Sequence, residues 1–174
     1  LVNNGKKNGM IIKYNSKGET EWAKAIGGKD YDSITSISQT EDEGYIVVGD
    51  FYSRSIELEN GIILNNNSSE NYDSNGMMVK YNAEGELEWA KVIGADNYDN
   101  ITSVAQTTDG GYIVGGYFRS DHIDLGNGVT LSNNGANDGM IIKYNSKGET
   151  EWAKNIGGSK TENINVIMET TEGG

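Results

Sequence analysis

The side chains that could do chemistry in this sequence are carboxylates and tyrosines gathered in a few short loops. Acidic clusters occur at Asp30–Asp32, Glu41–Glu43 and Asp96–Asp99. Paired carboxylates can hydrolyse glycosides, and several carboxylate oxygens together can bind Ca²⁺. His122 is the only histidine and there is no cysteine, so neither a Ser-His-Asp nor a Cys-His nucleophile system is expected. We predict that His122 is a surface loop residue and that no residue is catalytic.

Two of these loops hold the residues that we predict to bind a ligand. Each combines carboxylates with a tyrosine, whose ring has an apolar body and a polar tip that suit contact with sugars or peptides. The predicted ligand-binding residues are Tyr31, Asp32, Asp96, Tyr98 and Asp99, and Tyr52 and Tyr117 are further candidate contacts. Ca²⁺ is an alternative ligand for the same carboxylates, but the sequence contains no Asp-x-Asp-x-Asp-Gly loop. We therefore predict no metal site and no cofactor.

Composition narrows the partners that these loops can have. The chain has 174 residues, 24 glycines, no proline and a formal net charge of −12. Such an excess of carboxylates argues against nucleic acid and anionic membranes as partners, because phosphate contacts need clustered lysine and arginine. The longest apolar runs are four or five residues, as at Tyr45–Val48, so no membrane insertion is expected. A protein, a carbohydrate or a cation stays open.

Internal repeats organise the chain that carries these loops. The segment Gly9–Lys24 recurs unchanged as Gly139–Lys154, and a close variant, Gly76–Lys91, lies between them. The copies therefore start 67 and then 63 residues apart. The length difference falls in the Asn/Ser-rich stretch that precedes the second and third copies, which marks that stretch as a surface loop.

Within each repeat the pattern predicts strands and tight turns, and no helix of useful length. The expected strands of the first repeat are Met10–Asn15, Glu19–Ile26, Ile34–Thr40 and Tyr45–Phe51. Asn60–Gly61 and Asn127–Gly128 each join two short β-rich runs, which is a strong signal for a hairpin with positive φ at both turn residues. Four main strands in meander order per repeat of about 65 residues are typical of a propeller blade. Trp22, Trp89 and Trp152 recur at one position and are expected to pack between blades.

Several of these segments together resemble a known repeat. The segments Asp109–Phe118, Ile123–Leu131, Asp138–Asn145 and Glu151–Lys154 are similar to the seven-bladed, SBBP-type β-propeller repeat of bacterial secreted and surface proteins. The resemblance implies an extracellular or cell-surface location and a blade in which Ile34–Thr40 is the inner strand and Glu19–Ile26 the outer one. It implies no particular ligand.

The expected architecture is an all-β chain of propeller-type blades, each of four antiparallel strands. Residues 1–174 then form one propeller segment, with a partial blade at 1–28, blades at 29–95 and 96–158, and the start of a further blade at 159–174. Just under three repeats cannot close a ring. The expectation is either a piece of a longer polypeptide or a chain that self-associates to complete a ring.

The function that these observations favour is a non-enzymatic module that binds or scaffolds a protein or a glycan through its loops. Two alternatives stay open at this point. One is a propeller enzyme that uses paired carboxylates, as glycosidases do. The other is a purely architectural repeat segment in a surface protein.

Overall fold

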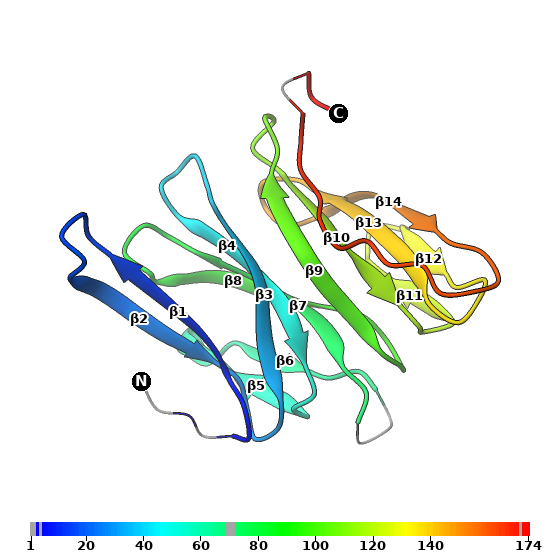
Figure 1. The fold of residues 1–174 in the computed structure, drawn as a ribbon, viewed down its shortest axis with the longest axis horizontal. Helices are drawn as coiled ribbons and strands as arrows, with labels where there is room; N and C mark the ends of the chain where they lie inside the picture. The colour runs from blue at the N-terminus through cyan, green and yellow to red at the C-terminus, as the bar shows by residue number, and fades with distance from the viewer. Residues whose placement is uncertain (1–2, 4, 69–71, 171) are drawn as a thin grey trace.

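The computed structural model describes residues 3, 5–68, 72–170 and 172–174, and these residues form an all-β protein (Figure 1). The strands are β1 (Gly9–Tyr14), β2 (Thr20–Ile26), β3 (Asp32–Gln39), β4 (Tyr45–Phe51), β5 (Ser55–Glu57), β6 (Ile63–Asn65), β7 (Asn75–Tyr81), β8 (Leu87–Ile93), β9 (Asp99–Gln106), β10 (Tyr112–Phe118), β11 (His122–Asp124), β12 (Thr130–Ser132), β13 (Asp138–Tyr144) and β14 (Thr150–Ile156). The short segment η1 (Glu59–Gly61) joins β5 to β6 as a single turn, in which Asn60 has left-handed rather than helical dihedral angles. The described residues contain no helix with the length and apolar character of a membrane span.

Two four-stranded antiparallel sheets form most of the molecule. The first sheet has the strand order β3-β4-β7-β8, and the second has the equivalent order β9-β10-β13-β14. The N-terminal hairpin, β1-β2, lies beside the first sheet, and the small hairpins β5-β6 and β11-β12 are inserted after the second strand of each sheet (Figure 1). The strands of the first sheet lie between Asp32 and Ile93, and those of the second between Asp99 and Ile156.

The first sheet is buried on both faces. Apolar side chains of its strands point alternately toward the second sheet and toward the N-terminal hairpin. In β4, Ile46 and Val48 join a core cluster with Ile101 of the second sheet. Val47 points the other way and joins a cluster with Ile11 of the N-terminal hairpin. A chain with only 35% hydrophobic residues can therefore build a continuous core by stacking thin sheets.

The recurring tryptophans pack between neighbouring sheets, as predicted, at two of their three positions. Trp22 of β2 meets the ring of Tyr45 in β4 edge to face, with 5.5 Å between ring centroids. Trp89 of β8 meets Tyr112 of β10 in the same way at 5.9 Å. Trp152, on β14, is 41% exposed.

The predicted Asn-Gly turns are confirmed. Asn60 and Gly61 have φ of 59° and 73°, and Asn127 and Gly128 have φ of 54° and 75°. These are the left-handed values that a two-residue turn requires at both positions and that asparagine and glycine adopt at the least cost.

Residues 162–170 run extended along the second sheet without forming a strand of their own. The hydroxyl of Thr102, in β9, donates a 2.5 Å hydrogen bond to the carbonyl of Ile164. Thr35, in β3, donates in the same way to the carbonyl of Ile101 in β9, at 2.6 Å. The segment 162–170 therefore lies against the second sheet as β9 lies against the first.

Candidate functional site

Loops at one edge of the first sheet enclose an open cleft lined by tyrosines, which we call the tyrosine cleft. It lies where β3 and β9 begin and where β4 ends, and its volume is about 510 Å³. This is the size of an ordinary small-molecule site. Its lining residues are Lys7, Asp30, Tyr31, Ser33, Asp50, Tyr52, Tyr72 and Tyr98.

The tyrosines of the cleft come from four separate loops, and two of them are exposed while Tyr52 and Tyr98 are half-buried. Tyr31 and Tyr72 are 52% and 72% exposed. The rings of Tyr52 and Tyr98 contact each other edge to face, with 6.3 Å between ring centroids. Of the tyrosines predicted from the sequence, Tyr31, Tyr52 and Tyr98 are thus brought together, whereas Tyr117 accepts a hydrogen bond from Asn100 at 2.8 Å and does not line the cleft.

A carboxylate that the sequence did not single out lies in the wall of this cleft. Asp50 is only 9% exposed, and no described residue donates a hydrogen bond to it. Burial raises its pKa from 3.8 to about 6, with the negative charge of Asp32 adding to the shift and the positive charge of Lys7 opposing it. A buried carboxylate without a partner is costly, and one that faces an open cleft is a candidate ligand contact.

Replacing Asp50 by asparagine is expected to stabilise the fold by about 1–2 kcal/mol at pH 7.5 and by no measurable amount at pH 3.5. The folded-state pKa lies above the unfolded one, so the ionised group opposes folding. That penalty is absent when both states are protonated, grows between about pH 4 and pH 6, and is complete above pH 6. Urea denaturation at the two pH values measures it.

The matched control for this substitution is Asp30→Asn, because Asp30 lines the same cleft but forms an exposed ion pair with Lys6 at 3.0 Å. Its free energy of unfolding should change by less than about 0.5 kcal/mol. A loss of stability in Asp50→Asn at pH 7.5 would mean that the carboxylate has a structural hydrogen bond, and would contradict this account.

Asp32 and Asp99, which the sequence placed among the ligand contacts, are fully buried structural residues. Each carboxylate accepts hydrogen bonds from three backbone N–H groups and one serine hydroxyl. For Asp99 the donors are Ala95 N, Arg119 N, Ser120 N and Ser120 Oγ, at 2.6–3.1 Å. For Asp32 they are Gly28 N, Tyr52 N, Ser53 N and Ser53 Oγ, at 2.7–3.2 Å. With 0% exposure, neither carboxylate reaches a ligand.

Asp96 lies apart from the tyrosine cleft. It lines a small pocket of about 190 Å³ together with Ser120 and His122. His122 is exposed, as predicted. Among the described residues, no group of three or more His, Cys, Asp or Glu side chains is placed to hold a metal ion. Of the five predicted ligand-binding residues, Tyr31 and Tyr98 therefore line the tyrosine cleft, together with the further candidate Tyr52.

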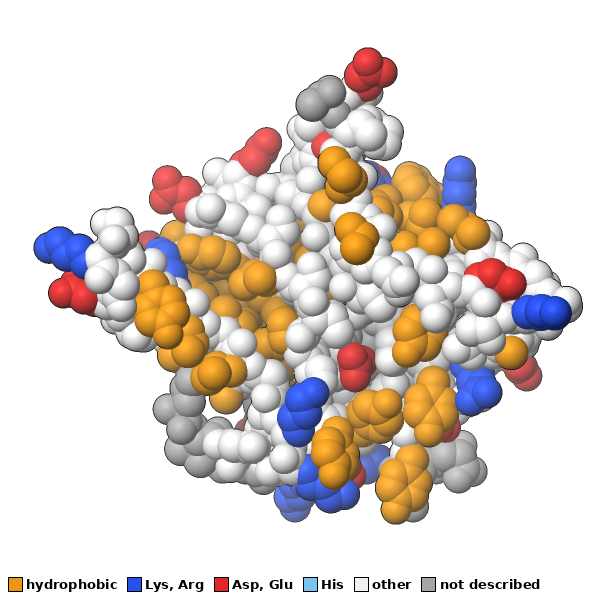
Figure 2. All heavy atoms as spheres, in the orientation of Figure 1, with side chains coloured by type: hydrophobic (Ala, Val, Ile, Leu, Met, Phe, Trp, Pro, Cys, Tyr) orange, Lys and Arg blue, Asp and Glu red, His pale blue; other side chains and the backbone are white. Residues whose placement is uncertain are grey.

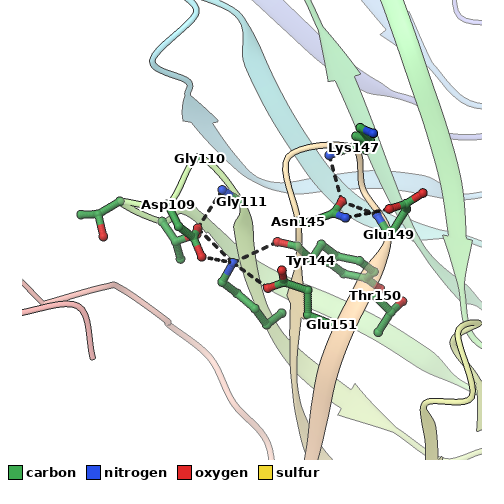
Figure 3. Close-up of polar contacts among 12 residues, drawn as sticks. Asp109, Gly110, Gly111, Tyr144, Asn145, Lys147, Glu149, Thr150 and Glu151 are labelled. Carbon is green, nitrogen blue, oxygen red and sulfur yellow. Dashed lines mark hydrogen bonds and ion pairs between the residues drawn. The ribbon is translucent and has the colours of Figure 1, made fainter.

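A second group of charged residues, at the opposite ends of the strands, ties the turns of each sheet together. Figure 3 shows Asp109, Tyr144 and Glu151 around one ammonium group, which is that of the buried Lys143. Burial lowers the pKa of Lys143, but hydrogen bonds to Asp109 and Glu151 outweigh it, so the net shift is upward. Lys80 repeats the arrangement in the first sheet. Because every member is paired inside the fold, we assign this cluster a structural role.

The fold and the repeat define an all-β repeat domain, and comparison with known proteins adds one distant similarity. The chain is 26% identical over 168 residues to the regulatory protein FlaEY of Caulobacter vibrioides. The aligned residues make up 94% of this chain and 17% of that protein. No protein-family model matches the chain. The chain thus spans about a sixth of the relative's length.

Proposed function

We propose that this chain is a non-enzymatic binding module of an extracellular or cell-surface protein, and that the tyrosine cleft binds carbohydrate. One observation carries the proposal: exposed tyrosine rings and an unpartnered buried carboxylate line the same cleft. A sugar presents an apolar C–H face and hydroxyl donors, which are complementary to an aromatic face and a carboxylate acceptor. A concave site of about 510 Å³ has the size of a small-molecule site, which suits one or two sugar rings.

The architecture proposed for the module is a row of propeller blades. Each four-stranded sheet follows meander order and covers its neighbour's face, which supports this assignment. The proposed extracellular or cell-surface location of the protein is based on the resemblance of its repeats to those of bacterial surface proteins. Self-association of such segments would complete a ring of blades.

Tyr52→Ala and Tyr98→Ala are each expected to weaken binding of the best glycan about tenfold, because each removes an aromatic contact worth about 1–2 kcal/mol. The measurement is a glycan array probed with the labelled chain, followed by titration calorimetry on the strongest hit. Tyr14→Ala is the control, since Tyr14 is 56% exposed but lies at the far end of β1. Equal binding by all the variants, or no glycan retained at millimolar concentration, would refute carbohydrate binding at this cleft.

Glycoside hydrolysis is the second candidate function, and one observation favours it. Asp30 and Asp50 line the same cleft, and burial raises the pKa of Asp50 to about 6, within the range of general acids. Mass spectrometry of any bound oligosaccharide distinguishes the two functions. Cleavage products that disappear in Asp50→Asn would make the cleft an active site; an intact oligosaccharide would support the binding module.

A further inference from the structure

The tyrosine cleft continues into a second pocket with a different charge. This pocket, of about 470 Å³, shares Asp30, Tyr52 and Tyr72 with the tyrosine cleft. Its lining also contains Lys6, Lys29 and Arg54, so we call it the basic pocket. Among the described lining residues there are three cations and one carboxylate, the reverse of the whole chain, which has 26 acidic residues and 14 basic ones. Figure 2 shows basic and hydrophobic side chains side by side along the lower edge of the molecule.

The cations of the basic pocket are held in place by the fold. Lys7 forms a parallel bridge with Tyr31 and so brings the N-terminal stretch, with Lys6, to the start of β3. Arg54 donates a hydrogen bond from Nη1 to the carbonyl of Ser68 at 2.5 Å, which positions its guanidinium. Lys6 also lies over the ring of Tyr31, at 5.3 Å from the centroid. The positive charges therefore border the aromatic rings of the tyrosine cleft.

From these positions we propose that the cleft selects an acidic carbohydrate, with the ligand's carboxylate in the basic pocket and its hydroxyls toward Asp50. The inference rests on the proposed carbohydrate binding and adds the class of sugar. Opposite charges in the two halves fix the direction of the ligand, because Asp50 would repel a carboxylate that the basic pocket attracts. The shared Tyr52 and Tyr72 then contact the sugar ring between the two ends.

The net charge of −12 does not prevent this. At physiological ionic strength charges are screened over about 8 Å, so an anion in the basic pocket responds mainly to the cations that line it. The ion pair of Lys6 with Asp30 is also exposed, with 54% and 31% of the two side chains accessible. Exposed pairs are weak and exchange partners readily, so Lys6 can turn to a ligand carboxylate.

A matched pair of probes tests the selectivity: a trimer of galacturonic acid and its fully methyl-esterified, uncharged form. Calorimetry at 50 mM salt should show the acid binding at least about tenfold more tightly than the ester. Raising the salt to 300 mM should weaken binding of the acid and leave binding of the ester unchanged. The double substitution Lys6→Gln and Lys29→Gln should remove most of the preference while circular dichroism shows an intact fold. Lys17→Gln, in the exposed turn between β1 and β2, is the control.

The outcomes separate this inference from the proposed function. If the ester binds as well as the acid, the proposed selectivity for acidic sugars is wrong and carbohydrate binding stands. The same holds if the lysine substitutions change the affinity for neither probe. If neither probe binds but the array retains neutral glycans through Tyr52 and Tyr98, the conclusion is the same. If no glycan is retained, both fail. Tight binding of a poly-glutamate peptide that survives Tyr52→Ala would instead make the basic pocket a site for acidic proteins.

Discussion

Replacing Asp99 by alanine is expected to destabilise the fold by about 3–5 kcal/mol, the largest effect of any single substitution considered for this chain. The substitution leaves four donors without an acceptor in a site that has 0% exposure. These donors belong to two loops, one before β9 and one after β10, so the carboxylate joins the beginning of one strand to the end of its neighbour. Urea denaturation followed by tryptophan fluorescence measures the loss.

Two further variants keep this prediction testable even if Asp99→Ala does not fold. Asp99→Asn retains one acceptor oxygen and should lose about half as much stability, since its amide group meets an N–H donor instead of accepting from it. Asp96→Ala, three residues away and exposed, should change the free energy of unfolding by less than about 0.5 kcal/mol. A loss below about 1 kcal/mol in Asp99→Ala would contradict the structural role and return Asp99 to the ligand candidates.

The repeat itself contained the signal that separates structural carboxylates from candidate ligand contacts. Asp32 and Asp99 are each followed 21 residues later by the serine that donates to them, Ser53 and Ser120. A pair that recurs at one spacing in both sheets points to a shared structural need. Asp50, by contrast, aligns with Tyr117 and interrupts an apolar strand. A charge that occurs in one repeat and not in the next is the better candidate for a site.

The strands and turns followed from the sequence because they depend on local alternation and on Asn-Gly pairs. The site did not, because it depends on contacts between distant parts of the chain. Lys6 and Lys7 precede the first repeated segment and reach the cleft through the backbone hydrogen bonds that Lys7 makes with Asp30 and Asp32. The net charge of −12 is a total over the chain, so it carries no information on the local group of cations in the basic pocket.

Contacts that recur between successive sheets leave one surface uncovered. The isoleucine side chains of Ile34, Ile101 and Ile164 pack against Gly9, Gly76 and Gly139, which lack a Cβ that would collide with them. The segment 162–170 therefore makes the contacts of an inner strand. Trp152, in contrast, has no ring against it among the described residues, although Trp22 and Trp89 are each covered by the tyrosine 23 residues further on.

A copy of the β4 sequence, Tyr-Ile-Val-Val-Gly-Asp-Phe, added after Gly174 is expected to stabilise the fold by about 2–3 kcal/mol and to raise Tm by about 5–10 °C. Gly174 occupies the position of Gly44, which directly precedes Tyr45. The carbonyl of Gly174 already accepts a hydrogen bond from Thr170 N, as that of Gly44 does from Thr40 N. The added tyrosine would then reach Trp152, and the added aliphatic residues would cover the apolar pocket lined by Ile113, Ile141 and Ile167.

The gain is modest for the area buried, because ordering seven residues costs about 1.5 kcal/mol each and offsets most of the hydrophobic contribution. An extension with Ser in place of Tyr, Ile and both Val residues is the control and should leave Tm unchanged. Trp152→Ala should reduce the gain in stability. In the chain that keeps Trp152, adding the β4 copy should also shift tryptophan emission to the blue. If both extensions shift Tm equally, residues 162–170 do not act as an inner strand, and the stacking of sheets ends with the second one.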